Sequence, residues 1–202
     1  MFISFEGCEG VGKSTQLNLL KEYLLKTRQP AIYVREPGST EISEKIRALI
    51  LDKQNGAMTD MTEALLYAAS RAQLVREVIK PALAEGKLVI CDRYVDSSVA
   101  YQGYGRELGA DAVRKLNAYA VDGCMPDVTV FIDLSPKNAW RYGRQADRLE
   151  QESDAFFERV YDGFKRESEL SNGRFICINP EYDKYATSKK IIAALRARGV
   201  IE

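Results

Sequence analysis

Residues 2–15 decide the fold, and they read Phe2-Ile3-Ser4-Phe5-Glu6-Gly7-Cys8-Glu9-Gly10-Val11-Gly12-Lys13-Ser14-Thr15. The part from Gly7 to Ser14 matches the phosphate-binding loop pattern G-x-x-x-x-G-K-[ST] at each fixed position. The run before it is apolar and β-prone, and the run after it carries Leu17, Leu20 and Leu24 at helical spacing. Strand, glycine-rich turn and helix is the arrangement that this motif needs.

The chemistry of the loop follows from its backbone. Glycines let several N–H groups turn inward around a phosphate, and the N-terminus of the next helix adds partial positive charge. The lysine of this motif reaches the β- and γ-phosphates and the next hydroxyl binds Mg²⁺, which assigns these roles to Lys13 and Ser14. The alternative is a glycine turn that matches by chance. We expect these residues around the phosphates of a nucleoside triphosphate: Gly7, Cys8, Glu9, Gly10, Val11, Gly12, Lys13, Ser14 and Thr15.

Composition excludes several classes of protein. At 202 residues, 46% of them hydrophobic and 29% charged, the chain suits one globular domain over residues 1–202. The formal net charge is zero, which argues against a general electrostatic grip on nucleic acid or an acidic membrane. No apolar run approaches the ~20 residues of a membrane span, and nothing resembles a signal peptide, so we expect a cytoplasmic protein. The chain has no histidine, which excludes an imidazole base or metal ligand.

Strand-like and helix-like runs alternate along the chain. The alternation predicts an α/β fold with a five-stranded parallel sheet and helices on both faces. The ends of four expected strands, at Phe5, Arg35, Asp92 and Asp133, should lie along one edge, where open α/β sheets bind ligands. The expected strands are 2–6, 31–35, 87–92, 127–133 and 174–178, and the expected helices are 13–27, 41–52, 61–84, 110–121, 152–170 and 184–198.

Two strand ends carry charged side chains. The run Arg35-Glu36-Pro37-Gly38-Ser39-Thr40 should stand beside the phosphate loop, although a polar turn with Thr40 as helix N-cap is the alternative. In Asp92-Arg93-Tyr94, we expect Asp92 to hold Mg²⁺ through water and Arg93 to clamp a phosphate. An internal ion pair between Asp92 and Arg93 is the alternative there.

The helix expected over residues 61–84 has two faces. One is an apolar stripe for the core, and the other brings Tyr67 and Arg71 together with two apolar residues. An aromatic ring beside a guanidinium suits a stacked, hydrogen-bonded base. The alternative is a helix packed on both sides, or a subunit interface, and we expect a homodimer that packs partly through this helix. The stripe comprises Leu65, Ala69, Ala72, Val75, Ile79 and Leu83, and the second face comprises Tyr67, Arg71, Leu74 and Val78.

Three arginines follow the fourth expected strand. Arg141, Arg144 and Arg148 lie in a polar stretch between two helical segments. We expect a short lid at about 141–151 whose arginines close over a triphosphate and stabilise charge in the transition state. A solvated basic face is the alternative.

Taken in order along essentially the whole chain, these motifs resemble those of the thymidylate kinases, which phosphorylate dTMP with ATP. The phosphate loop is generic, but the segment Asp92-Arg93-Tyr94 with Ser97-Ser98-Val99-Ala100-Tyr101-Gln102-Gly103 is much more specific. The basic lid and the Cys8-Glu9 pair in the loop resemble the bacterial branch. The other matching segments are Phe5-Glu6-Gly7 through Thr15, Arg35-Glu36-Pro37-Gly38, Tyr67-Ala68-Ala69-Ser70-Arg71 and Asp147-Arg148-Leu149-Glu150, with a weaker match at Asn179-Pro180-Glu181 to the adenine-side loop.

The resemblance implies a P-loop nucleoside monophosphate kinase-like fold, ATP and dTMP as substrates, Mg²⁺ as cofactor and a homodimer. It implies that Tyr67 stacks on thymine, that Arg71 bonds the base and that Tyr101 crowds the 2′ position. Lys13, Arg93, Arg141, Arg144 and Arg148 are the catalytic residues that it implies. The implied Mg²⁺ ligands are Ser14 and Asp92, with Glu9 as a further ligand. The implied dTMP-binding residues are Glu36, Pro37, Tyr67, Arg71, Arg93, Ser98, Tyr101 and Gln102.

The acceptor decides between the alternatives. A phosphate acceptor is mostly dianionic near pH 7 and needs charge neutralisation and alignment rather than a base, which suits a chain rich in arginine and free of histidine. A nucleoside hydroxyl would need a carboxylate base, and Glu36 could serve in a deoxynucleoside kinase. Another nucleoside monophosphate kinase, or a switch module that holds nucleotide without a second substrate, also remains open.

Overall fold

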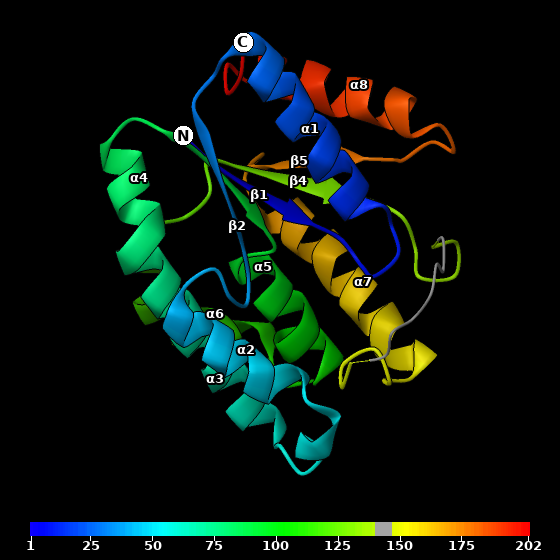
Figure 1. Ribbon diagram of the computed structural model, residues 1–202. Coiled ribbons are helices and arrows are strands. Elements are labelled where there is room, and N and C mark those ends of the chain that lie inside the picture. The colour runs from blue at the N-terminus through cyan, green and yellow to red at the C-terminus, as the bar shows by residue number, and fades with distance from the viewer. Residues whose placement is uncertain (140–146) are drawn as a thin grey trace.

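The computed structural model describes residues 1–139 and 147–202, and its centre is a parallel five-stranded sheet (Figure 1). The strand order is β2-β3-β1-β4-β5, so β1 lies in the middle and the connection from β3 to β4 crosses over it. The sequence prediction of a five-stranded parallel sheet with helices on both faces is confirmed. The strands are β1 (Phe2–Glu6), β2 (Ala31–Arg35), β3 (Leu88–Asp92), β4 (Val128–Ile132) and β5 (Phe175–Ile178).

Helices cover both faces of the sheet. In Figure 1, α1 and α8 lie side by side above it, while α5, α7 and the pair α2 and α3 lie below. The expected helix ranges agree with the structure to within two residues, except that the long one over 61–84 is divided. The helices are α1 (Lys13–Thr27), α2 (Glu41–Leu51), α3 (Asp60–Leu74), α4 (Lys80–Ala84), α5 (Val95–Ser98), α6 (Ala110–Val121), α7 (Asp154–Leu170) and α8 (Lys184–Ala197).

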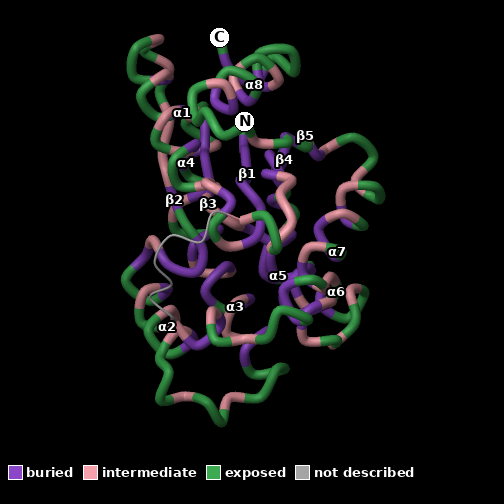
Figure 2. The backbone as a smooth tube through the Cα atoms, turned by 90° about the vertical axis from the view of Figure 1, so that its right-hand side faces the viewer, coloured by how far each residue is buried: buried purple, intermediate pink, exposed green. Residues whose placement is uncertain are grey.

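The alternation of side chains along β1 shows how the sheet is buried. Ile3 belongs to a core cluster with Leu20 and Leu24 of α1, whereas Phe2 packs in a second cluster with Val75, which follows α3. Figure 2 shows the buried strands as a continuous purple centre between more exposed helices. Apolar runs buried on both faces are typical of parallel strands, as the sequence predicted.

The apolar stripe expected on the helix over 61–84 is buried over only part of its length. Leu65 is 53% exposed and Ala69 is also exposed, whereas Val75 and Ile79 are fully buried, and so are Arg71 and Leu74 of the second face. The physical reason is twofold. Arg71 finds a buried carboxylate partner, and the wider π-helical turn over residues 75–79 interrupts the 3.6-residue period on which the stripe was drawn.

One helical segment is missing from the sequence analysis. After β3 the chain forms α5 and then a π-helical turn over residues 99–105, which carries the most specific motif of the chain. This turn packs closely on α7 because two glycines leave room. A Cβ atom at Gly105 would stand 2.7 Å from Phe156, and one at Gly163 would stand 2.7 Å from Tyr104.

The carboxyl ends of the strands meet at one edge, as expected. Phe5 and Arg35 both pair in register with Asp92, and Asp133 follows β4 directly. The side chains that follow these strands therefore gather at that edge. Among the described residues, none of the helices has the length and apolar character that a membrane crossing requires.

Candidate active site

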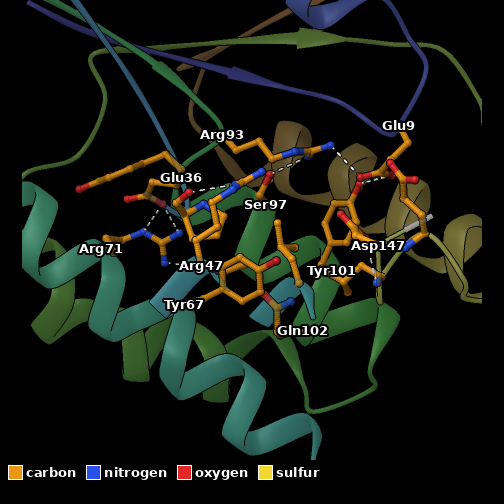
Figure 3. Close-up of a pocket in the computed structure, with 16 residues that line it drawn as sticks. Glu9, Glu36, Arg47, Tyr67, Arg71, Arg93, Ser97, Tyr101, Gln102 and Asp147 are labelled. Atoms are coloured by element: carbon orange, nitrogen blue, oxygen red, sulfur yellow. Dashed lines mark hydrogen bonds and ion pairs between the residues drawn. The ribbon is translucent and has the colours of Figure 1, made fainter. Parts of the chain in front are cut away.

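Two cavities meet at the carboxyl edge of the sheet. The inner cavity, of about 110 Å³, is enclosed by β2, α3 and the segment after β3. The outer cavity, of about 960 Å³, is lined by the loop Cys8–Thr15 and by residues 181–185. In Figure 3, Arg93 and Glu9 lie at the top of the inner cavity, with Tyr67 and Gln102 at its bottom. The inner cavity is lined by Glu36, Pro37, Tyr67, Arg71, Arg93, Ser98, Tyr101 and Gln102, which are all of the residues expected to bind dTMP.

The glycine-rich loop forms the floor of the outer cavity. Gly10 and Gly12 have φ angles of 72° and 89°, in the left-handed region that glycine adopts without steric cost. Ser14 lies in the first turn of α1 and is exposed to the outer cavity. Backbone N–H groups at this helix start are free of helical partners, which makes the loop a natural anion site.

Lys13 is paired with a carboxylate beneath the loop. Its Nζ donates to Asp92, the last residue of β3. Burial alone would raise the pKa of Asp92, but the Lys13 charge and its hydrogen bond outweigh burial and lower that pKa. Asp92 lines a third cavity, of about 280 Å³, beside α1 and β2. The expected role of Asp92 in holding Mg²⁺ stays a prediction.

Glu9 joins the loop to the segment after β3. Its Oε1 pairs with Nη2 of Arg93 at 2.9 Å, and its Oε2 accepts a 2.5 Å bond from the Tyr101 hydroxyl. The neighbouring Cys8 is 2% exposed, and burial raises the pKa of its thiol. Cys8 therefore contributes its backbone, rather than a reactive thiolate, to the loop.

Arg93 is held in an unusual backbone conformation. Its φ is 67°, its N–H donates to the Phe5 carbonyl at 2.9 Å, and the next N–H, of Tyr94, donates to Glu6 at 2.8 Å. Its Nη1 also meets the Ser97 hydroxyl at 3.1 Å, and that hydroxyl donates to Glu6 at 2.5 Å. A left-handed non-glycine residue fixed from both sides is typical of a functional site.

The carboxyl group of Glu6 is fully buried beneath Arg93. Burial and the nearby Asp96 raise the pKa of Glu6 to about 8, against the opposing bonds from Ser97 and the Tyr94 N–H. Glu6 is linked to the Arg93 side chain through the Ser97 hydroxyl, which bonds both of them.

A buried ion pair between Arg71 and Glu36 forms part of the wall of the inner cavity. Arg71 is 1% exposed; its Nε donates to Glu36 at 2.8 Å and its Nη2 also contacts Glu36. Its Nη1 bonds Ser98 at 3.1 Å and also Asn117, which no sequence motif indicates. Burial raises the pKa of Glu36 to about 7, against the opposing charge of Arg71. This network fixes the guanidinium plane beside Tyr67, which lines the same cavity.

Two arginines stand where the cavities meet. Arg47 of α2 and Arg93 line both cavities, together with Glu9, Asp147 and Glu150. Arg47 donates to the Pro37 carbonyl at 2.9 Å, and burial with the Arg35 charge lowers its pKa. The sequence analysis missed Arg47. Its position about two turns into a helix that follows a predicted ligand-binding strand end is the signal that could have found it.

Arg148 is placed differently from the mobile arginine that the sequence suggested. It is 9% exposed, its Nε donates to the Ile50 carbonyl at 2.9 Å, and its Nη2 pairs with Glu63 at 2.5 Å. In this arrangement it fastens this part of the expected lid to α2 and α3. Arg141 and Arg144 lie outside the described residues, so their catalytic roles stay predictions.

The site offers oxygen ligands for a magnesium ion. Across residues 1–139 and 147–202, no group of three or more acidic or cysteine side chains forms a metal centre. Mg²⁺ usually takes one or two protein oxygens and completes its shell with substrate phosphates and water. The Ser14 hydroxyl, with Glu9 and Asp92 close to the same loop, fits that need.

The outer cavity extends to the loop after β5. Gln16 Nε2 donates to the Lys184 carbonyl at 3.1 Å, which ties α1 to that loop. Glu181 and Tyr182 line the cavity, and the adenine-side role expected for Asn179-Pro180-Glu181 stays a prediction. One cavity shaped by a glycine loop, joined through two arginines to a second with a polar wall, defines the α/β class of P-loop nucleoside monophosphate kinases.

The chain belongs to the thymidylate kinase family, whose model, described as "Thymidylate kinase", matches residues 5–191. It is 47% identical over 197 residues to a thymidylate kinase of Thermoanaerobacter sp. (strain X514), covering 96% of this chain and 97% of that relative. A thymidylate kinase of Limosilactobacillus fermentum is 45% identical over 203 residues, with coverage of 98% and 95%. A crystal structure of thymidylate kinase from Ehrlichia chaffeensis matches with a TM-score of 0.79 at 33% identity, covering 97% and 98% of the two chains.

Proposed function

We propose that this enzyme transfers the γ-phosphoryl group of ATP to dTMP, giving dTDP and ADP. Membership of the thymidylate kinase family supports this activity over the alternatives. The single observation that carries it is the pair of joined cavities, because a phosphoryl transfer between two nucleotides needs two sites that share a wall.

The outer cavity takes ATP in this proposal. Backbone N–H groups of Gly7–Thr15 surround the phosphates. Lys13 binds the γ-phosphate, either in place of Asp92 or together with it. Mg²⁺ neutralises phosphate charge when bound, and Ser14 with Asp92 or Glu9 would hold it. Glu181 and Tyr182 stand on the side where the adenine would lie.

The inner cavity takes dTMP. Arg93 and Arg47, which line both cavities, hold the acceptor phosphate at the boundary and direct it towards the γ-phosphate. Tyr67 stacks on the thymine ring, and Arg71 donates to the base from its fixed position against Glu36. The Tyr101 ring, held through its hydroxyl to Glu9, limits the space at the 2′ position and favours deoxyribose.

The chemistry then needs no general base. The acceptor phosphate is already mostly ionised near pH 7, so the protein aligns two anions and neutralises their charge. Arginines of the expected lid at about 141–151 would add further positive charge. Glu36, which a deoxynucleoside kinase could use as a base, is already paired to Arg71, which favours the nucleotide as acceptor.

A direct test is an acceptor screen. The protein is incubated with ATP, Mg²⁺ and either dTMP, thymidine or no acceptor, and the products are separated by ion-exchange chromatography. We expect rapid dTDP formation from dTMP and little ATP hydrolysis without an acceptor. Phosphorylation of thymidine but not dTMP would support a deoxynucleoside kinase, and ATP hydrolysis without an acceptor would support the switch module.

We further infer a homodimer that uses the outward faces of α2 and α3. Ile42 and Leu49 on α2, and Met61 and Leu65 on α3, are each 45% to 53% exposed, and the two helices pack side by side. A second copy would remove these apolar side chains from water. Sedimentation equilibrium at micromolar concentration should give twice the chain mass of 22.7 kDa. A single species at the chain mass would contradict the dimer.

We place the enzyme in the cytoplasm. Its four cysteines are free, and three of them are buried, so none forms a disulfide. Unpaired thiols suit a reducing compartment.

A further inference from the structure

The amide of Gln102 is oriented by a residue outside the cavity. Its Nε2 donates to Oε1 of Glu63 at 2.9 Å. Gln102 is 1% exposed and lines the inner cavity, and its Oε1 is buried without a hydrogen-bond partner among the described residues. A buried, unpartnered oxygen at the wall of a ligand cavity calls for a donor on the ligand.

Glu63 is itself held in its ionised, carboxylate form. It is fully buried on α3, and its carboxylate accepts bonds from Arg106 at 3.0 Å and from Arg148 at 2.5 Å. Burial alone would raise the pKa of Glu63, but the bonds and charge of these arginines, with the Gln102 bond, lower it. A carboxylate accepts hydrogen bonds and donates none, so the Gln102 amide must turn its NH₂ group towards Glu63.

We propose that Glu63 is a positioning residue for base specificity, because it locks Gln102 with its amide oxygen towards the N3–H group of the base. This inference rests on the proposed placement of dTMP in the inner cavity. Thymine and uracil carry a donor at N3, whereas cytosine has an acceptor there. The locked oxygen therefore selects a base with N3–H and rejects one without it. The 5-methyl group of thymine takes no part in this selection.

The arrangement of donors around Glu63 predicts what Glu63→Gln does. Oε2 accepts from Arg106 and Arg148 at 3.0 and 2.5 Å, whereas Oε1 accepts from Gln102 and, at a longer 3.3 Å, from Nε of Arg106. The single oxygen of the new amide should therefore take the place of Oε2, where the two shorter bonds from charged donors meet. The new NH₂ group then faces Gln102, whose amide turns over to accept from it. Gln102 would now present its own NH₂ group to the base, which reverses the preference at N3.

The test compares dTMP, dUMP and dCMP as acceptors with saturating ATP and Mg²⁺. In Glu63→Gln we expect kcat/KM for dTMP and dUMP to fall together by about 10- to 100-fold, as for the loss of one hydrogen bond at a buried site. The value for dCMP should stay or rise, measured as an inhibition constant where turnover is slow. An equal loss for all three nucleotides, or no change for dTMP, would overturn the inference.

Glu152→Gln is the matched control. Glu152 pairs with the same Arg106, at 2.5 Å, whereas the amide of Gln102 donates to Glu63 and not to Glu152. The dTMP to dCMP ratio should stay at the wild-type value in this variant. A fall in the ratio there as large as in Glu63→Gln would mean that weakening the Arg106 network is enough, and it too would overturn the inference.

Gln102→Ala separates this inference from the proposed function. If Gln102→Ala leaves the nucleotide preference unchanged, the base does not lie against Gln102 and the proposed placement fails. If it lowers the preference and Glu63→Gln does not, the Glu63 inference alone fails. In the Gln102→Ala background, Glu63→Gln should add no further change in preference.

The wild-type protein provides a measurement that does not depend on the folding of a variant. By NMR in the absence of ligand, the side-chain NH₂ proton of Gln102 that bonds Glu63 should exchange slowly with water, because a buried carboxylate accepts it. Exchange as fast as that of a solvent-exposed glutamine would show that Glu63 does not lock the amide, and would overturn the inference.

Discussion

The outer and inner cavities are built by different means. The outer cavity is lined by eight consecutive residues, Cys8–Thr15, whose backbone N–H groups bind phosphate in the proposed function. Lys13 is the cation of this stretch. The inner cavity is lined by buried side chains from separate elements: Arg71 of its wall meets Glu36 across 35 positions, and behind that wall Arg148 meets Glu63 across 85. The comparison indicates that binding phosphate needs a local backbone shape, whereas choosing an acceptor needs side chains fixed by distant partners.

The largest effect should come from Lys13, the cation of the loop that lines the outer cavity. Lys13→Ala removes a cation at the transferred phosphoryl group, and kcat should fall by about 10³-fold while the KM for dTMP changes little. Initial rates over a grid of both substrates measure this. Lys21→Ala on the same helix is the control, because Lys21 lies over the Tyr33 ring and away from the loop, and it should keep wild-type kcat. Unchanged turnover in Lys13→Ala would refute the role of the loop.

Arg71→Ala should act on the other cavity and on stability at once. It leaves Glu36 buried without its partner, so the free energy of unfolding should fall by about 3–5 kcal/mol. The KM for dTMP should rise by ten-fold or more, and the KM for ATP should not. Denaturant titration and steady-state kinetics measure the two effects. Arg71→Lys keeps a charge beside Glu36, so it should recover stability more than it recovers the KM for dTMP.

The sequence predicted the outer cavity better than the inner one for a physical reason. The loop motif is contiguous, so the strand, the turn and the start of α1 at Lys13 all follow from local pattern. The burial of Arg71 and the exposure of Leu65 were not predicted, because a periodic stripe cannot show that a charged residue has a buried partner. Asn117, Glu63 and Arg47 were missed because their roles depend on contacts between distant elements, which spacing in a single sequence does not record.

A smaller effect should come from Glu6, the buried carboxyl group that is linked to Arg93 through Ser97. The folded-state pKa of Glu6, about 8, lies above its ordinary value of 4.5, so the folded protein binds this proton more tightly than the unfolded chain. The contribution of Glu6 to stability is therefore present below about pH 4.5 and is lost as pH rises to about 8, by at most about 1.4 kcal/mol per pH unit.

Denaturant titrations between pH 5 and 8.5 on wild type and Glu6→Gln measure this contribution. The wild type should lose stability relative to the variant as pH rises, because the amide cannot ionise. A constant difference between the two proteins across this range would show that Glu6 does not titrate there.

The smallest effect should come from Cys8, a residue of the loop that lines the outer cavity. Because the loop binds through its backbone, Cys8→Ala should change kcat/KM for ATP by less than about threefold, although loss of the buried sulfur lowers stability by about 1 kcal/mol. Kinetics and thermal unfolding of this variant check the expectation. A large loss of activity with an intact fold would mean that the Cys8 side chain takes part in binding.

Binding of dTMP without ATP tests the separation of the two cavities most directly. Isothermal titration calorimetry should be performed with dTMP on wild type, Lys13→Ala and Arg71→Ala. The account predicts that Lys13→Ala binds dTMP with a Kd within about twofold of wild type, and that Arg71→Ala binds it at least tenfold more weakly. Loss of dTMP binding in Lys13→Ala, or wild-type binding in Arg71→Ala, would contradict it.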